Sequence, residues 1–255
     1  MALQGVEAVV HLAGESLAAG RWSRARKGVL LASRVRGTRL LSETLSSLDP
    51  PPRVMVSASA IGIYGDRGGE RLTESSPAGS GFLPGLVTAW ERATGPAEAS
   101  GIRVVRLRTA LVMTARGGVL ARLRLPFGLG LGGTLGSGRQ WMSWITLDDL
   151  VRAIEFALAT DTIAGPVNAA APGAVTNLEF TRTLARVMGR PGFVRVPAAA
   201  LRLALGGIAD EALLASARVE PERLLAAGFA FRDPALEPAL RALLGRPRAA
   251  PAPAG

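Results

Sequence analysis

The chain has 255 residues, of which 48% are hydrophobic and 20% are charged, with no cysteine and a single histidine, His11. This length is enough to bury one large core or two small ones. Without cysteine there can be no disulfide, iron–sulfur cluster or cysteine nucleophile, and one histidine is too few for the usual zinc sites. We therefore expect no metal site, and any chemistry must use hydroxyls, carboxylates, arginines or a bound cofactor.

The net charge is +10 at pH 7, and 29 of the 30 basic residues are arginines. These arginines are scattered along the chain, and no aromatic residues are interleaved with them as stacking platforms for bases. We therefore expect a solvated basic surface and no nucleic-acid partner. The sequence contains no apolar run of about 18 residues and no N-terminal signal segment, so we expect a cytoplasmic protein without a membrane span.

Strand and helix patterns alternate through the first two thirds of the chain. An apolar run over 6–14 predicts a buried strand. Residues 23–48 carry apolar side chains at helical spacing, Val29 and Leu30 among them, until the prolines of 49–52 end the helix. The alternation continues with strands at 53–57, 102–107 and 166–169 and helices at 86–99 and 147–159. This order predicts an α/β fold with a doubly wound parallel sheet.

After about Val175 the pattern changes to helices without intervening strands. We expect these helices at 177–188, 198–205, 220–227 and 234–244. Residues 1–175 should form the α/β domain, with substrate-side loops at 115–145. Residues 176–245 should form a small, mainly helical substrate or lid domain. The residues 246–255, rich in proline and alanine, should be a disordered tail.

Two segments have the residue types of a ligand site. Gly128–Gly133 matches the spelling G-x-G-x-x-G, but it follows a helix-like segment and leads into no helix, whereas the dinucleotide fingerprint joins a strand to a helix. We interpret this segment as a flexible substrate-side loop. The second segment, 57–66, ends a predicted strand in a turn that contains Ser57 and Ser59. Such turns lie at the carboxyl edge of a parallel sheet, where ligands bind.

Several segments in order resemble the extended short-chain dehydrogenase/reductases, the family of nucleotide-sugar epimerases and dehydratases. They are His11–Gly14, Arg36–Leu41, Ser57–Gly65, Leu107–Val112, Trp144–Leu150 and Pro166–Ala169. Others are similar to an atypical epimerase-family branch with its own C-terminal domain of unknown function. These are 117–118, 127–133, 136–140, 195–197, 219–224 and 227–231. Together the resemblances cover nearly all of residues 3 to 245.

The resemblance implies a Rossmann-like domain that binds NADP or NAD and a cleft for a small-molecule substrate. It implies cofactor contacts at Leu12, Ala13, Gly14, Ser57, Leu111 and Val112. The catalytic candidates that it implies are Ser59, which would orient the substrate, and Tyr64, which could donate a proton. Arg139 and Trp141 fall in the segment expected to shape the substrate pocket.

The chain departs from the family pattern at its beginning. Extended reductases start with a strand and a Gly-x-x-Gly-x-x-Gly turn that holds the cofactor pyrophosphate. Here the first segment resembles the family's fourth strand, so we expect an incomplete sheet and a chain that is a fragment or follows an incorrectly assigned start. The choice between NAD and NADP depends on that earlier segment, so it stays open, as does the oligomeric state.

The second departure concerns the family's Tyr-x-x-x-Lys pair, in which a tyrosine exchanges the proton and a lysine lowers its pKa. The chain has one tyrosine, Tyr64, and one lysine, Lys27, and they are far apart in sequence. The resemblance puts Leu83 and Val87 at the two positions, and neither can transfer a proton.

Two functions therefore remain open at the level of the sequence. The first is an NAD(P)-dependent epimerase or oxidoreductase, impaired in this chain by loss of the glycine-rich segment. The second is a non-catalytic NAD(P)-binding sensor or scaffold.

Overall fold

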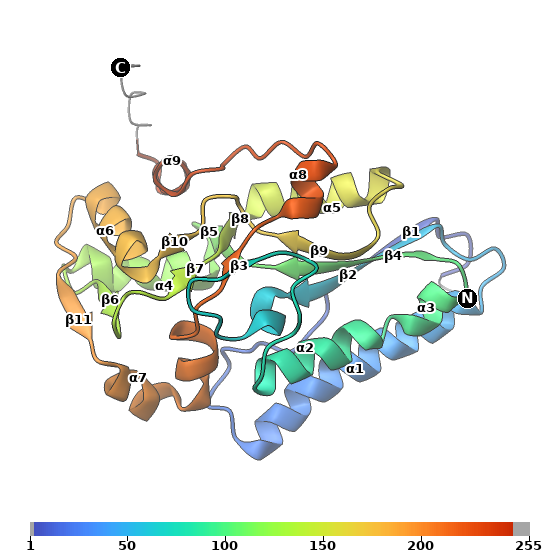
Figure 1. Ribbon diagram of the computed structural model, residues 1–255, viewed down its shortest axis with the longest axis horizontal. Coiled ribbons are helices and arrows are strands. Elements are labelled where there is room, and N and C mark those ends of the chain that lie inside the picture. The colour runs from blue at the N-terminus through green and yellow to red at the C-terminus, as the bar shows by residue number, and fades with distance from the viewer. Residues whose placement is uncertain (1–2, 247–255) are drawn as a thin grey trace.

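A four-stranded parallel sheet in the order β1-β2-β4-β9 forms the centre of the computed structural model, which describes residues 3–246 (Figure 1). The strands are β1 (Ala8–His11), β2 (Val54–Ala60), β4 (Arg103–Thr109) and β9 (Gly165–Ala169). Every neighbouring pair runs parallel, which confirms the predicted α/β fold with a parallel sheet.

Helices cover both faces of this sheet (Figure 1). Helices α1 (Arg24–Ser46) and α3 (Gly95–Ala99) lie on one face, at the bottom of the view. Helices α5 (Leu147–Ala159) and α8 (Glu222–Ala226) lie on the other face. The strands β2 and β4 are therefore largely buried on both sides, as in doubly wound folds. The buried strand predicted at 6–14 is wrong in this respect, because the residues of β1 at the edge of the sheet are exposed or half-buried.

The side chains of β2 and β4 alternate between the two faces, and each face receives apolar residues from both strands. Met55 pairs in register with Val104, and both pack with residues of α1 and α3. The next pair, Val56 and Val105, packs with α5 and α8. Burial on both faces explains why apolar residues occupy consecutive positions in these strands, as in Val54–Val56 and in the pair Val104 and Val105.

The loop after β1 and the turn after β2 begin side by side. In the parallel register of these strands, His11 is the partner of Ser57. Both segments therefore leave the sheet at its carboxyl edge, which is the arrangement that the resemblance implied.

Helix α1 confirms the helix predicted at 23–48. The Ser23 hydroxyl caps its N-terminus by accepting a hydrogen bond from the Arg26 N–H. Its buried side chains recur every three or four residues: Leu30, Arg34, Thr38, Ser42 and Leu45. Val29 is 49% exposed. The buried face thus includes polar residues that the apolar pattern does not reveal.

The single helix predicted at 86–99 is wrong, because the chain forms two helices there. Helix α2 (Phe82–Arg92) starts earlier, and α3 follows after a short break. Pro96 lies in the first turn of α3. Proline has no N–H to donate, so it is tolerated at a helix start but interrupts a continuing helix.

The remaining helices agree closely with the prediction. Helices α5, α6 (Asn177–Met188) and α7 (Ala198–Leu205) have the predicted bounds, whereas α8 and α9 (Leu236–Leu243) are shorter. Helix α4 (Gly118–Gly128) lies in the segment expected to contain loops. Thr146 and Thr176 cap the N-termini of α5 and α6 with their hydroxyls.

The expectation that no strands follow Val175 was wrong. Three short strands occur in or at the edge of this segment, β10 (Val175–Thr176), β11 (Val194–Val196) and β12 (Arg218–Val219). They pair with β7 (Trp141–Met142), β6 (Gly133–Leu135) and β3 (Arg71–Leu72), respectively. A further pair joins β5 (Leu111–Thr114) to β8 (Trp144–Thr146). Two single turns complete the elements, a 3₁₀ turn at Ile61–Tyr64 and a π-helical turn at Ala209–Leu213.

The C-terminal helices share a core with the preceding segment. One apolar cluster combines Leu120 of α4 and Trp144 of β8 with Phe180 of α6 and Leu240 of α9. These elements gather on the left of Figure 1. The boundary expected at residue 175 therefore separates two sequence patterns but not two cores.

Within residues 3–246, no helix combines the length and the apolar character needed to cross a bilayer. The same residues contain no group of three or more His, Asp or Glu side chains that could hold a metal ion. The tail expected at 246–255 lies outside the described residues, apart from Arg246.

Candidate functional site

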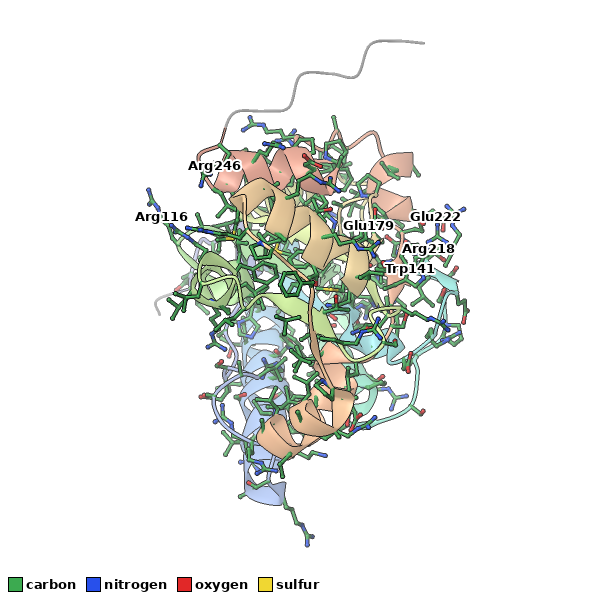
Figure 2. The ribbon with its side chains drawn as sticks, turned by 90° about the vertical axis from the view of Figure 1, so that its left-hand side faces the viewer. Arg116, Trp141, Glu179, Arg218, Glu222 and Arg246 are labelled. Atoms are coloured by element: carbon green, nitrogen blue, oxygen red, sulfur yellow. The ribbon has the colours of Figure 1, made fainter. Side chains whose placement is uncertain are left out.

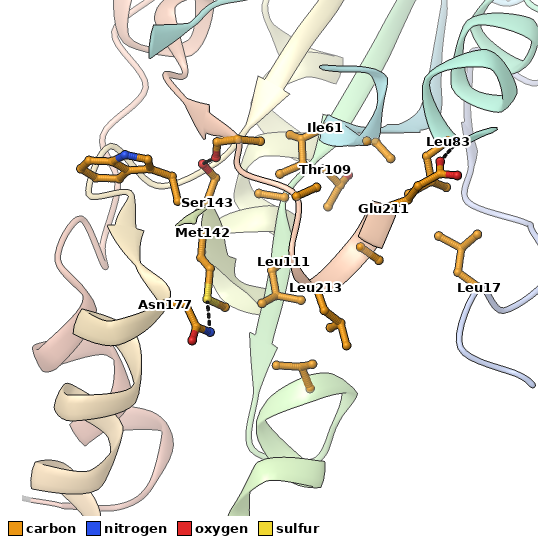
Figure 3. A pocket seen from close by; sticks show the side chains of 18 of the residues that line it. Leu17, Ile61, Leu83, Thr109, Leu111, Met142, Ser143, Asn177, Glu211 and Leu213 are labelled. Atoms are coloured by element: carbon orange, nitrogen blue, oxygen red, sulfur yellow. Dashed lines mark hydrogen bonds between the residues drawn. The ribbon is translucent and has the colours of Figure 1, made fainter. Parts of the chain in front are cut away.

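A cavity of about 570 Å³ lies beyond the carboxyl ends of β2 and β4 (Figure 3). Its walls include the turn after β2, helix α2, the start of β5 and the C-terminal residues 211–213. Ligands of open α/β sheets bind outside the carboxyl ends of the strands, and this volume suits a small molecule. The cavity is therefore the candidate functional site.

The wall is mainly apolar, and several of its polar groups are already bonded to the protein. The Ser143 hydroxyl donates to the Ala217 carbonyl over 2.8 Å, and the Asn177 amide oxygen accepts from the Leu135 N–H over 2.8 Å. Such groups have little capacity left for a ligand. Three wall residues are charged or reactive and keep hydrogen-bonding capacity for a ligand: Ser59, Arg34 and Glu211.

Ser59 is held in place by an ion pair. Its hydroxyl donates a hydrogen bond of 2.6 Å to Oε1 of Glu91, and Arg108 donates to both oxygens of that carboxylate over 2.8 and 2.9 Å. Burial by itself lowers the pKa of Arg108, but the Glu91 carboxylate outweighs it and raises that pKa, so the guanidinium stays charged. Ser59 thus has one preferred orientation, with its oxygen lone pairs free.

Tyr64 lies inside the fold and not on the cavity wall. Its side chain is fully buried, and its oxygen accepts a hydrogen bond of 3.0 Å from Arg108 and lies 2.7 Å from the Asn168 amide oxygen, to which it can donate. Burial raises the pKa of Tyr64 against the opposing effect of Arg108. This geometry makes Tyr64 a buried support for Arg108 and does not favour it as a proton donor to a ligand in the cavity.

Leu83 and Val87 are on the cavity wall, in helix α2. They stand at the positions that the resemblance assigned to the tyrosine and the lysine of the family. Because neither side chain can exchange a proton, proton transfer in the cavity would need another group.

Glu211 is a wall carboxylate that the sequence analysis missed. Its Oε2 accepts a hydrogen bond of 2.6 Å from the Leu83 N–H in the first turn of α2 (Figure 3). The carboxylate thereby satisfies a helix N–H that has no partner within the helix. No sequence signal marked Glu211, because it falls between two predicted helices.

Arg34 is a second wall residue that the sequence analysis missed. It belongs to α1, is 8% exposed, and has its Cζ atom 5.1 Å from the centre of the Trp90 ring. Its spacing of four residues from the buried Leu30 was a signal that could have placed it on the inner face of α1.

Comparison with known proteins gives the family. Residues 1–170 match the model of the NAD dependent epimerase/dehydratase family, and residues 196–243 match a domain of unknown function, DUF1731. The chain belongs to the NAD-dependent epimerase/dehydratase family. The resemblance inferred from the sequence motifs, including the match to a domain of unknown function near the C-terminus, is thereby confirmed.

Individual relatives agree with this membership. The epimerase family protein Mb2239 of Mycobacterium bovis is 45% identical over 246 residues, which cover 96% of this chain and 81% of that protein. The crystal structure of the human epimerase family protein SDR39U1 (isoform 2) with NADPH is 33% identical, with a TM-score of 0.91 over 95% of this chain and 83% of that one. A nucleoside-diphosphate sugar epimerase from Corynebacterium glutamicum is 36% identical, with a TM-score of 0.78 over 95% of this chain and 47% of that one.

The expected cofactor residues of this epimerase-family chain lie in different surroundings. Leu111 is on the cavity wall. Ser57 is buried within β2, and Val112 packs with the core cluster on the α5 side, so neither is part of the wall. The loop Leu12–Gly14 is exposed, and it approaches the cavity through Gly14, where a Cβ atom would lie 3.3 Å from Cζ of Arg34.

The two residues expected to contact the substrate also differ in their position relative to the cavity. Trp141 is on the cavity wall, and Cζ of Arg218 lies 4.4 Å from the centre of its ring (Figure 2). Arg139 is exposed and is not part of the wall. The structure thus brings Ser59, Leu111 and Trp141 together around one cavity, without Arg139.

The glycine-rich segment Gly128–Gly133 runs from the end of α4 into β6. This context confirms that it lacks the strand-to-helix geometry of a dinucleotide fingerprint. It is a packed connection and not a loose loop, because a side chain at Gly132 would collide with the ring of Phe127.

His11 supports the wall indirectly. Its Nε2 atom lies 3.1 Å from the Thr38 hydroxyl, which also accepts a hydrogen bond of 2.9 Å from the Trp90 indole. Burial lowers the pKa of His11, so the ring favours its neutral form.

Proposed function

We propose that the protein uses NADP or NAD to exchange a hydride with a small molecule bound in the cavity, as an epimerase or oxidoreductase. The observation that carries this proposal is the Ser59 hydroxyl, fixed by Glu91 on the wall of a cavity at the carboxyl edge of a parallel sheet. The structure of the human relative with NADPH supports the choice of cofactor.

The wall residues suit the nicotinamide end of such a cofactor. Ala60 ends β2 and Gly62 lies in the turn after it, and Thr109 ends β4 with Ala110 after it, so small side chains border the cavity where these strands end. Leu111 offers an apolar contact for a planar ring. When bound there, the cofactor supplies or accepts the hydride.

The remaining wall residues would orient the substrate and handle its proton. Ser59 would bind the hydroxyl form of the reacting oxygen, because the free lone pairs of Ser59 can accept a hydrogen bond from that hydroxyl while its own hydrogen stays on Glu91. Glu211 would take or return the proton, since its Oε1 is not used in the bond to Leu83. Leu83 and Val87 would keep water from the reacting atoms.

One observation favours a second function, a non-catalytic NAD(P)-binding sensor or scaffold. The two positions that carry the proton-transfer pair in the family are occupied by Leu83 and Val87. In that case the cofactor would bind, but no substrate would oxidise or reduce it.

The test measures binding and turnover separately. NADPH and reduced nicotinamide mononucleotide, which represents the end that the cavity suits, are titrated into the protein. Oxidation is then followed by the absorbance of the dihydronicotinamide in the presence of a panel of aldehydes and ketones. We expect turnover with at least one compound, and a loss of about 100-fold or more in Ser59→Ala.

Ser42→Ala is the matched control, because Ser42 is a buried serine of α1 that is not part of the cavity wall. It should keep full turnover. Turnover that is unchanged in Ser59→Ala would contradict the role of Ser59. Cofactor binding without turnover would support the sensor, and binding of neither nucleotide would contradict both functions.

A further inference from the structure

Four large apolar side chains are exposed to solvent where helix α4 leads into β6 and where the chain enters β11. They are between 63% and 84% exposed: Leu125, Leu129, Leu131 and Phe193. Single exposed apolar residues are common on protein surfaces, whereas several that lie together mark an interaction site.

These side chains belong to two segments that pack against each other. Leu129 lies one helical turn after Leu125 and donates its N–H to the Leu125 carbonyl over 3.1 Å. A Cβ atom at Gly130 would lie 3.3 Å from Cγ of Pro191, two residues before Phe193. Beyond this contact, β6 and β11 run side by side as a parallel pair. Both segments lie toward the left of Figure 1, at the end of the molecule opposite β1, and Figure 2 shows the molecule from that side.

Exposed arginines flank these apolar residues. Arg122, Leu125 and Leu129 are spaced by three and four residues, so they share the outer side of α4 and its end. Arg195 is exposed two residues after Phe193, and residues two apart in an extended segment point the same way. The other two exposed arginines of these segments are Arg124 and Arg190.

No acidic residue of these segments balances the charge. The sequence has no aspartate or glutamate in residues 99–147 or in residues 180–209, the two stretches that contain the segments. Within residues 3–246, every ion pair is made by an arginine other than these four. The four apolar residues and the four arginines, called the α4–β11 patch below, therefore combine apolar side chains with positive charge alone.

From this combination we infer that the α4–β11 patch binds the surface of an anionic lipid bilayer. The guanidinium groups would contact headgroup phosphates, and the leucines and Phe193 would enter the boundary between headgroups and acyl chains. Such peripheral binding needs no membrane-spanning helix. Because α4 and β6 also supply cavity-wall residues, Leu123 and Leu135 among them, the cavity would lie close to the bound membrane. The inference goes beyond the proposed function, since it requires neither cofactor nor substrate.

The same features disfavour two other occupants of the patch. A second copy of the chain would place the patch against itself, because dimer interfaces are usually two-fold symmetric, and the arginines would then face one another. A nucleic acid would meet three leucines, which offer no ring on which bases could stack.

Sedimentation with vesicles measures the contribution of charge. The vesicles contain phosphatidylcholine alone or equal parts of phosphatidylcholine and phosphatidylserine, and the wild type should bind the mixed vesicles about tenfold tighter or better. Arg122→Gln combined with Arg195→Gln should lose about tenfold or more of this affinity. The matched control combines Arg36→Gln with Arg92→Gln, at two exposed arginines of α1 and α2, and should bind within about twofold of the wild type.

A second pair of variants tests the apolar side chains and keeps the net charge. Leu129→Gln combined with Phe193→Gln should also lose about tenfold or more of the affinity for mixed vesicles. The control combines Leu40→Gln with Leu225→Gln, at exposed leucines outside the patch, and should keep it. All substituted positions are exposed, so the melting temperatures should stay close to that of the wild type. Full affinity in the Leu129 and Phe193 variant would overturn the inference, because attraction between charges alone would then explain the binding.

Insertion into the bilayer can be observed directly, because the chain has no cysteine. A single Leu131→Cys is labelled with a fluorophore whose emission depends on the polarity of its surroundings. Its emission should shift to the blue with mixed vesicles, whereas the same label at Leu40→Cys on α1 should show no shift.

Polyglutamate and a single-stranded oligonucleotide serve as anionic probes without lipid. If either probe binds in a way that depends on Arg122 and Arg195 while vesicles do not bind, the patch belongs to an acidic protein or a nucleic acid, and the inference is overturned. Vesicle affinities that are equal in the patch variants and their controls would also overturn it. So would an unshifted emission of the label at position 131.

Discussion

Ser59 on the cavity wall and Glu91 on helix α2 are joined by a hydrogen bond of 2.6 Å, and the same carboxylate neutralises the buried Arg108. This contact couples a candidate catalytic hydroxyl to an ion pair in the interior. Substitution of Glu91 should therefore lower the free energy of unfolding more than substitution of Ser59, because Glu91 balances a buried charge and Ser59 does not.

Glu91→Gln should destabilise the protein by about 3 kcal/mol, since it leaves the Arg108 guanidinium buried without a counter-charge. Ser59→Ala should cost about 1 kcal/mol, because Glu91 keeps both bonds to Arg108. Urea denaturation measures both values. Equal losses of unfolding free energy in the two variants would contradict this division of roles.

Tyr64→Phe should lower the free energy of unfolding by about 1–3 kcal/mol, because it removes a bonding partner of the buried Arg108 and Asn168 groups. Turnover per folded molecule should stay unchanged, since Tyr64 is not on the cavity wall. Denaturation and steady-state kinetics on the same preparation separate the two effects. A fall in kcat of about 100-fold with unchanged stability would instead identify Tyr64 as a proton donor.

Glu211→Gln tests whether this carboxylate handles a proton or caps a helix. Glutamine can still accept the Leu83 N–H bond, so the cap and the stability should persist, whereas kcat should fall by about 100-fold or more. Glu211→Ala should lose the cap as well, at a cost of about 1 kcal/mol. Full kcat in Glu211→Gln would limit Glu211 to a structural role.

The pH dependence of stability near neutrality should depend on His11, the single histidine of the chain. Burial lowers its pKa in the folded state below the ordinary value of 6.5, so the unfolded chain binds a proton first as the pH falls. The free energy of unfolding should therefore decrease as the pH drops from above 6.5 toward the lowered folded-state pKa.

His11→Gln provides the comparison for this pH dependence. The free energy of unfolding of the variant, measured by denaturation across the same pH range, should stay constant where that of the wild type decreases. A wild type whose stability does not change below pH 6.5, or a variant that loses as much as the wild type, would contradict the assignment to His11.

The parallel sheet and most of the long helices could be predicted because local signals and tertiary packing agree. Helices α5 and α6 begin after threonine caps, at Thr146 and Thr176, and α6 ends at Gly189 in the left-handed conformation. Strands β10 to β12 could not be predicted. Strands of two or three residues make few hydrogen bonds, so they form only where the tertiary fold aligns them.

The candidate site was predictable where a motif marked it. Ser59 was found from a segment predicted as a turn, although the structure extends β2 through it to Ala60, and Leu111 was found from the segment that follows β4. Glu211 could not be predicted, because its contact with Leu83 joins residues that are 128 positions apart in the sequence. Arg139 was misplaced, because it lies in the exposed loop before β7, whereas Trp141 is the first residue of β7 and lies on the wall.

A crystal structure of the protein with reduced nicotinamide mononucleotide or NADPH would test the proposed function most sharply. We predict density for the dihydronicotinamide ring inside the cavity, beside the turn that follows β2 and against Leu111. A nicotinamide ring bound elsewhere on the molecule, with the cavity closed or filled by other groups, would contradict it.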